Sequence, residues 1–169
     1  GFTTLGSSSF EGCCVTLETL KIGESAIGQN FGNDSFKGIS TLKSVTVDNG
    51  VTSLGQGSFS DCTELQLVTL PNSLLRIGIG AFSGCSKIAS ITIPSNVMTI
   101  GSQAFYHCLS LKSLVWGDHI TAIEKEAFFG CDALISINFP ETIETIGEKA
   151  FSECSNLETV SIPGSVTSI

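Results

Sequence analysis

A phenylalanine recurs every 23 residues along most of this 169-residue chain, and this period constrains the fold more than any other feature. The series consists of Phe36, Phe59, Phe82, Phe105, Phe128 and Phe151. Self-similarity at a fixed period of about 20 to 50 residues is typical of arrays in which each repeat stacks on the next. We therefore interpret the chain as one structural unit copied about seven times.

Each repeat carries apolar residues at fixed distances from its phenylalanine. With the Phe as position zero, position +3 is mostly Cys, and positions +6, +9, +11, +15 and +18 are mostly Leu, Ile or Val. Position +12 is usually Pro and position +19 is usually Gly. The alternation up to position +11 favours a strand, and Pro should end it because Pro has no N–H to donate. The following x-x-Ala-Phe-x-x-Cys segment favours a single helical or 3₁₀ turn.

This pattern predicts strands at residues 44–47, 67–70, 90–93, 113–116, 136–139 and 159–162. One strand and one turn cannot bury an apolar face alone, so each repeat must bury its face against the next. Stacked in this way, the strands lie side by side and parallel, about 4.8 Å apart.

Two stretches show the motif most fully. Residues 93–111 read IPSNVMTIGSQAFYHCLSL, and residues 139–157 read FPETIETIGEKAFSECSNL. This pattern resembles the BspA-like leucine-rich repeat, also called the Treponema-type repeat, over nearly the whole chain. We therefore expect a leucine-rich-repeat-like, right-handed β-solenoid with a concave parallel sheet, short helical or 3₁₀ turns and about seven 23-residue coils. The resemblance also implies a surface protein of bacteria or parasitic protists that binds partners.

Residues 1–169 contain no linker, so we expect one solenoid domain. Solenoids need capping repeats with a polar outer face, whereas Val166 and Ile169 would lie on an open core edge. We therefore expect a fragment of a longer array, whose open ends offer a surface for self-association. No apolar run approaches the about 20 residues that a membrane span needs, so we expect no membrane insertion in this segment.

The net charge of −8 is concentrated in one part of the chain, since residues 118–158 hold nine acidic residues and only two lysines. Nucleic acids and anionic lipids require a basic face, so neither is an expected partner. The acids lack the Asp/Asn/Gly spacing of a calcium loop. They either form a solvated face that keeps the array soluble, or attract a basic partner or a hard cation.

Five of the seven cysteines follow the repeat: Cys62, Cys85, Cys108, Cys131 and Cys154. This spacing places them in a column, where Cys can pack as a small apolar residue. We expect these thiols to be buried and reduced. A disulfide between neighbours and a metal site are the alternatives, but no Cys-x-x-Cys pair is present, and we predict no metal site.

The repeat from Phe105 to Ala127 departs from the pattern, and it holds the only Tyr, the only Trp and both His of the chain. Departures from a regular scaffold often mark functional positions. The candidate binding residues in and near this repeat are Tyr106, His107, Val115, Asp118, His119 and Asn138. The alternative is neutral drift of the repeat, in which case Trp116 simply fills the core.

The outward positions of the predicted strands, +8 and +10, are mostly Ser and Thr. They form either a ladder of hydroxyls that can bond an extended ligand or an inert strand face, because Thr suits strands intrinsically. The repeat 105–127 would supply the specificity of such a surface.

Catalysis finds no support in the sequence. The chain lacks a Gly-x-Ser-x-Gly elbow, a glycine-rich phosphate loop and His/carboxylate metal spacing, and only His107, Asp118 and His119 form a group worth testing. We therefore predict no enzyme activity and no cofactor. The expected function is a non-catalytic binding module of a cell-surface or secreted protein, mediating adhesion or binding a protein or glycan. The alternative is a scaffold repeat in an intracellular or cytoskeletal assembly.

Overall fold

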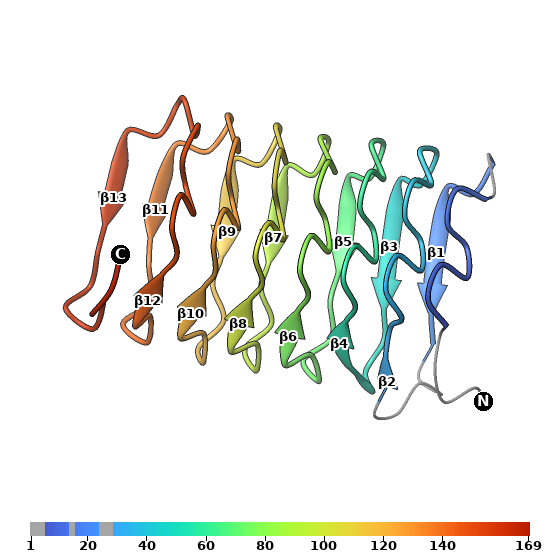
Figure 1. The fold of residues 1–169 in the computed structure, drawn as a ribbon, viewed down its shortest axis with the longest axis horizontal. Coiled ribbons are helices and arrows are strands. Elements are labelled where there is room, and N and C mark those ends of the chain that lie inside the picture. The colour runs from blue at the N-terminus through green and yellow to red at the C-terminus, as the bar shows by residue number, and fades with distance from the viewer. Residues whose placement is uncertain (1–5, 14–15, 24–28) are drawn as a thin grey trace.

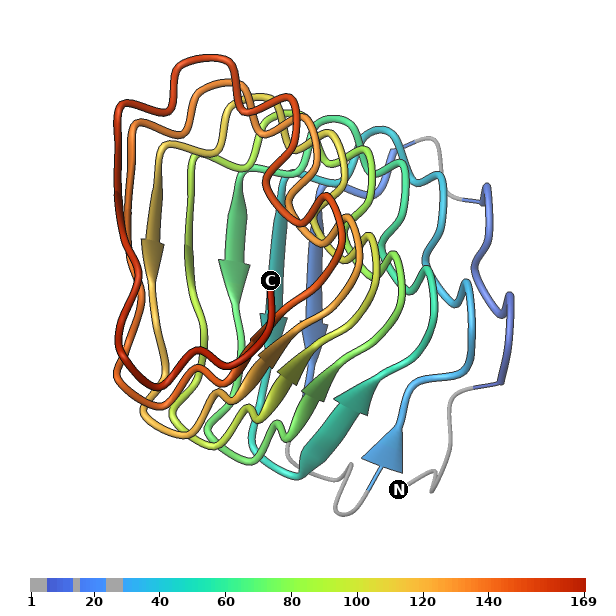
Figure 2. The same ribbon diagram turned by 60° about the vertical axis from the view of Figure 1, so that its left-hand side comes forward.

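The computed structural model describes residues 6–13, 16–23 and 29–169. The chain winds as a β-solenoid in which successive coils lie side by side, and most coils add one strand to each of two rows (Figure 1). Seen from the C-terminal end, the chain turns counterclockwise as it advances toward the viewer, so the solenoid is right-handed, as predicted (Figure 2). The two rows of the described part correspond to about six full coils, slightly fewer than the seven expected.

The first row contains the strands that the sequence predicts. Its members are β1 (Thr19–Ile22), β3 (Ser44–Val47), β5 (Leu67–Thr69), β7 (Ser90–Thr92), β9 (Ser113–Val115), β11 (Ser136–Asn138) and β13 (Thr159–Ser161). From β3 onward paired residues are 23 positions apart, as in Ser44 beside Leu67 and Ser90 beside Ser113. Hydrogen bonds divide the row into three parallel groups, β1-β3-β5, β7-β9 and β11-β13, whereas we expected one unbroken sheet.

The second row was not predicted. It is a six-stranded parallel sheet of β2 (Gln29–Asn30), β4 (Val51–Leu54), β6 (Arg76–Ile77), β8 (Thr99–Ile100), β10 (Ala122–Ile123) and β12 (Thr145–Ile146). Most of these strands are only two residues long. The two buried residues of this part of the repeat, such as Leu74 before β6 and Ile77 within it, are three positions apart. Such a short element shows no alternation, so each repeat has two strands where the pattern indicated one.

The expected helical or 3₁₀ turn was wrong, because the described residues contain no helix of either kind. In the segment around each phenylalanine, successive backbone N–H groups instead make two kinds of hydrogen bond in alternation. Ser58 and Ser60 donate three residues back within the turn, whereas Gly57 and Phe59 donate to the next coil. Positive φ angles two residues before and two after the Phe, such as 57° at Gln103 and 54° at His107, prevent a helix from continuing.

The core is a continuous stack of phenylalanine rings. Neighbouring rings are parallel within 5–11°, and their centroids are 5.1–5.5 Å apart. The stack comprises Phe10, Phe36, Phe59, Phe82, Phe105, Phe128 and Phe151. The four middle members, from Phe59 to Phe128, are fully buried among the Leu, Ile and Val columns. The apolar columns are therefore buried between stacked coils and cannot contact a ligand.

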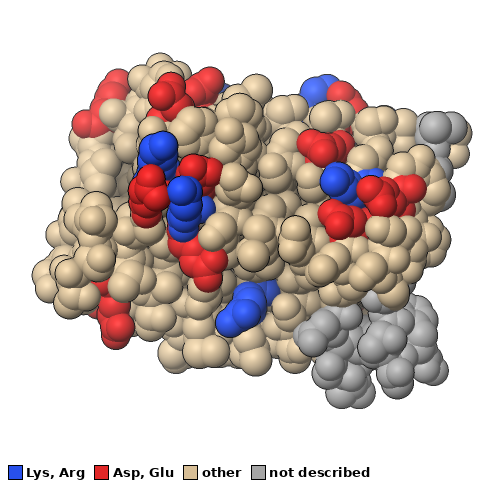
Figure 3. Space-filling view, viewed as in Figure 1, with Lys and Arg blue, Asp and Glu red and all other residues tan. Residues whose placement is uncertain are grey.

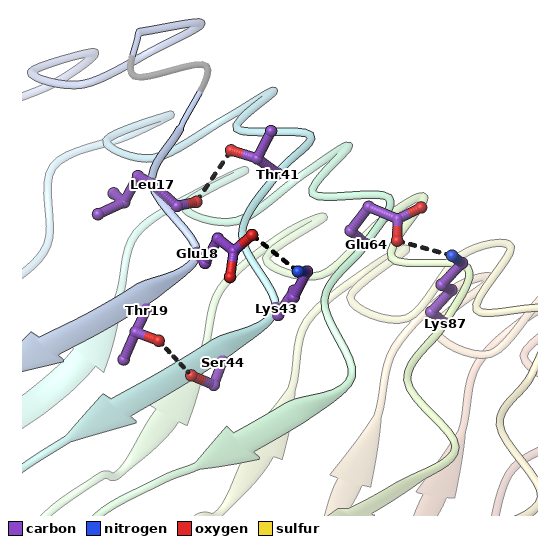
Figure 4. Close-up of polar contacts among 8 residues, drawn as sticks. All are labelled: Leu17, Glu18, Thr19, Thr41, Lys43, Ser44, Glu64 and Lys87. Atoms are coloured by element: carbon purple, nitrogen blue, oxygen red, sulfur yellow. Dashed lines mark hydrogen bonds and ion pairs between the residues drawn. The ribbon is translucent and has the colours of Figure 1, made fainter.

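Side chains also connect neighbouring coils at the surface (Figure 4). The ammonium of Lys43 lies 2.8 Å from a carboxylate oxygen of Glu18, and that of Lys87 lies 2.6 Å from Glu64. The hydroxyl of Ser44 donates to that of Thr19 over 3.2 Å. These bonds follow the repeat because each residue lies beside the residue one coil earlier.

The C-terminal end exposes part of the apolar core. A hollow of about 250 Å³ there is lined by residues that include Phe139, Phe151 and Leu157. The side chain of Ile169 is 77% exposed. Self-association at this open end remains a prediction. The described residues contain no long apolar helix of the kind that crosses a lipid bilayer.

Candidate binding site

The outward side of the first row forms a surface that we call the strand face. It consists of Ser44, Leu67, Ser90, Ser113, Ser136 and Thr159 in one column and Thr46, Thr69, Thr92, Val115, Asn138 and Ser161 in the next. From β5 to β13 all of these side chains are exposed, and none is charged. The strand face is therefore a long, neutral surface of small hydroxyls, as the sequence predicted.

Two apolar residues interrupt this surface. Leu67 is 63% exposed and Val115 is 57% exposed, although both are large aliphatic residues. Val115 pairs with Thr92, and Asn138 pairs with Ser161. Since β9 and β11 lie side by side, the candidate residues Val115 and Asn138 are neighbours in one column (Figure 1). The structure thus brings these two candidates together.

Tyr106 and His107 lie elsewhere, on the turn side of the solenoid. The Tyr106 ring stacks on Phe129, with centroids 5.0 Å apart and planes 9° apart. The His107 ring lies 4.3 Å from Tyr106 and 5.8 Å from Phe129. We call Tyr106, His107 and Phe129 the aromatic ledge. No ring contact or hydrogen bond within the described residues joins it to the strand face.

Phe129 is a ledge residue that the sequence reasoning missed. It occupies position +1 of its repeat, which is the position of Tyr106 in the preceding repeat. Residues at the same position of successive repeats lie side by side. The shared position of Tyr106 and Phe129 could therefore have predicted that their rings stack. The imidazole of His107 lies close to Gly130, since a Cβ on Gly130 would be 2.3 Å from the imidazole Cδ2.

Asp118 and His119 occupy an exposed corner between β9 and β10. The Nδ1 of His119 lies 2.9 Å from the Ser95 carbonyl oxygen, and its backbone N–H donates to the same oxygen. No contact among the described residues joins His119 to His107, which lies before β9. In the described ranges no three His, Cys, Asp or Glu side chains are placed to hold a metal ion.

Trp116 belongs to the core rather than to a binding surface. Its ring meets Phe128 edge-on at 6.0 Å and Phe139 at 5.6 Å, and the residue is half-buried. Trp116 therefore packs against the core as a partly buried side chain.

Several acids of residues 118–158 bond to neighbouring coils. The Glu124 carboxylate accepts from the Ser102 N–H at 2.9 Å and the Ser102 hydroxyl at 3.0 Å. Lys125 lies 3.0 Å from Glu148, and this contact lowers the pKa of the Glu148 carboxyl. Figure 3 shows the acids in clusters that include basic residues, together with acidic patches near the C-terminal end. These contacts give part of the acidic region a structural role.

The cysteine column lies against the phenylalanine stack. The thiols of Cys62, Cys85, Cys108 and Cys131 are buried as predicted, and that of Cys154 is half-buried. Each of the five donates to the carbonyl of the preceding coil's Phe, over 3.0–3.3 Å. Burial raises the pKa of Cys62 to about 12 and raises the pKa of Cys85, Cys108 and Cys131 as well. Such thiols are poor nucleophiles and poor metal ligands because both roles need the thiolate.

Comparison with known proteins settles the family. The family model described as the BspA type leucine rich repeat region (6 copies) matches residues 3–135 and, overlapping with them, residues 52–169. The chain belongs to the BspA-type leucine-rich repeat family. No curated protein matches its sequence.

Solved structures of bacterial leucine-rich repeat proteins share the fold. A leucine-rich repeat protein from Bacteroides ovatus is 33% identical with a TM-score of 0.87, and the match covers 97% of this chain and 42% of that one. A leucine rich cell surface protein from Faecalibacterium prausnitzii is 30% identical with a TM-score of 0.84, covering 94% of this chain and 42% of that one. The leucine-rich repeat protein of Treponema pallidum is 26% identical with a TM-score of 0.81, covering 88% and 71%.

This BspA-type chain is thus similar to bacterial cell-surface leucine-rich repeat proteins, as the family resemblance implied. It spans 42% of the length of the first two of these relatives.

Proposed function

We propose that this chain is a non-catalytic binding module of a bacterial cell-surface or secreted protein, and that it binds a protein or glycan through the strand face. The observation that carries the proposal is the continuous row of exposed, uncharged side chains from β5 to β13. The similarity to a leucine rich cell surface protein of Faecalibacterium prausnitzii supports the location. Repeat arrays commonly bind on such extended surfaces.

The chemistry of the strand face favours an extended, neutral or weakly basic ligand. Hydroxyls at a regular strand spacing can donate and accept along a polypeptide or a sugar chain. Specificity must come from the side chains that differ from the repeat, which are Leu67, Val115 and Asn138. A strongly acidic ligand is disfavoured because the chain carries a net charge of −8.

The aromatic ledge offers a second contact. Tyr106, His107 and Phe129 form a flat, partly exposed group on the turn side, away from the strand face. Aromatic rings with a polar atom at the edge are over-represented at binding hot spots. We therefore propose that the ledge meets a ligand only when that ligand is large enough to reach around the coil.

A binding screen against extracellular matrix proteins and a glycan array tests this function. Val115→Glu places a charge in the middle of the strand face and should weaken binding of any ligand found by about tenfold or more. Thr63→Glu adds the same charge at an exposed turn position and should leave binding unchanged. Equal effects of the two substitutions would move the site off the strand face. Self-association as the sole detectable interaction would favour the scaffold function.

A further inference from the structure

Arg76 is the only arginine of the chain, and it lies in β6, in the second row of strands. It pairs in register with Ser53 on one side and Thr99 on the other. Farther along the same column stand Ala122 and Thr145. A long cationic side chain therefore stands alone in a column of small residues, none of which can neutralise it.

Most basic residues in the described part of this chain have a carboxylate partner there, whereas Arg76 has none. Within the described residues, five of the seven lysines lie within 4 Å of a carboxylate, and four of these five lysines reach a carboxylate of a neighbouring coil. The side chain of Arg76 is exposed, and it makes no ion pair or hydrogen bond to any residue of the described ranges. Glu124 lines the same hollow as Arg76, but its carboxylate is held by Ser102. Figure 3 shows a basic patch over β6, separate from the mixed clusters.

Exposed aliphatic side chains lie beside this cation. Leu75 is 44% exposed and Met98 is 50% exposed, and both line a shallow hollow of about 340 Å³ together with Arg76, Ser53 and Thr99. A second hollow of about 250 Å³ on the other side of Arg76 includes Ile79, which is also largely exposed. A cation between two hollows with aliphatic walls fits a ligand that carries an anionic group beside an apolar one.

We infer that Arg76 with Leu75 and Met98 forms a recognition site for an acidic peptide segment of a partner protein, in which a carboxylate adjoins an aliphatic side chain. The guanidinium fork binds a carboxylate with two parallel hydrogen bonds. Leu75 and Met98 pack against the aliphatic side chain of the peptide. The flexible Met side chain can adapt to aliphatic side chains of different shape. A peptide fits better than an acidic sugar because the walls are aliphatic and offer no aromatic ring on which a sugar would stack.

This site deepens the proposed binding function, but it uses the second row and not the strand face. It also reverses the charge preference locally, since the chain as a whole repels acidic ligands. Recognition of an acidic segment should therefore be confined to the surroundings of Arg76 and should weaken as salt rises.

Two synthetic peptides test the inference, Ac-Leu-Glu-Leu-Glu-Leu-NH₂ and its glutamine analogue, each labelled for fluorescence polarisation. The glutamate peptide should bind at least about tenfold tighter than the glutamine peptide. Arg76→Gln should remove this difference, whereas Lys112→Gln should preserve it, because Lys112 is another exposed base without an ion pair. Arg76→Lys should retain only part of the binding, since an ammonium lacks the bidentate fork.

Equal binding of the two peptides, no binding of either, or equal losses in the Arg76 and Lys112 variants would overturn the inference. Tighter binding of an oligogalacturonate than of the glutamate peptide would overturn its commitment to a protein partner. Val115→Glu distinguishes a failure of this inference from a failure of the proposed function. The substitution should weaken binding of strand-face ligands and leave binding of the glutamate peptide intact.

Discussion

The ring of Phe105 lies 5.1 Å from the ring of Phe128, centroid to centroid, and the two planes differ by only 7°. Both rings are fully buried, and each belongs to a different coil. The contact between them is therefore a contact between repeats, and the stack that it continues holds the solenoid together along its axis. Because each coil touches mainly its neighbours, a defect in the stack should weaken the interfaces on both sides.

Phe105→Ala should lower the free energy of unfolding by about 3–5 kcal/mol, because it removes a buried ring and leaves a cavity in the stack. Phe10→Ala is the matched control, since Phe10 stacks on Phe36 but is 42% exposed, and it should cost much less. Urea denaturation followed by circular dichroism measures both values. A loss below about 1 kcal/mol for Phe105→Ala would show that the Phe column is not core.

Gly78→Ala should destabilise the protein by about 1–3 kcal/mol, the usual cost of overpacking. A Cβ on Gly78 would lie 2.4 Å from the Leu54 carbonyl oxygen, and this backbone atom of the preceding coil cannot move alone. Gly164→Ala is the control because a Cβ there meets nothing within 4 Å. Thermal denaturation of the two variants should show a clear drop in Tm for Gly78→Ala alone, and equal values would refute the close approach between coils.

The stability of the protein should fall as the pH rises from about 9 to 12. Burial raises the pKa of Cys62 from 9.0 to about 12, and the buried thiols that follow in the column shift in the same direction. Below the unfolded pKa both states hold the proton, so stability is unaffected. Above it the unfolded chain loses protons that the folded chain keeps, which favours unfolding.

Denaturation midpoints at pH 8 and pH 10.5 measure this effect. The informative quantity is the difference in stability loss between the wild type and Cys85→Ala, because this difference isolates the contribution of one buried thiol. The variant should lose less stability between the two pH values.

In the native protein at pH 8, thiol titration should find few reactive cysteines, and their number should increase on denaturation. Mass spectrometry that showed linked neighbouring cysteines would contradict the reduced column.

Asn138→Ala should weaken binding of a strand-face ligand, because Asn138 offers both a donor and an acceptor in the exposed column. Tyr106→Ala and His107→Ala should reduce affinity by a smaller factor, about two- to tenfold, and only for ligands that reach the aromatic ledge. Isothermal titration calorimetry with the wild type and the three variants provides the comparison. Unchanged affinity in all three would place the site elsewhere.

The sequence predicted the elements that repeat with a clear chemical alternation. The Phe column, the buried cysteines and the start of each first-row strand from β3 to β13 followed from residue type and spacing. The second row did not, since a strand such as Arg76–Ile77 is too short to show a period. The turns were mistaken for helical ones because positive φ angles at Gln103 or Lys149 are not visible in the residue type.

The candidate site was predictable only in part. Exposure of Val115 and Asn138 follows from strand alternation, so their neighbourhood in one column could be read from the repeat. The separation of Tyr106 and His107 from that column depends on how the coil turns between β8 and β9. Arg76 is visible in the sequence as the only arginine, but its missing partner is a property of the packed surface alone.

Hydrogen–deuterium exchange with and without a ligand from the binding screen tests the central claim most directly. We expect added protection at the backbone amides of β7, β9 and β11, centred on Ser113–Val115, while the turns around Phe59 and Phe82 remain unchanged. Protection confined to those turns or to the second row of strands, with none in the first row, would contradict the claim that the strand face is the binding surface.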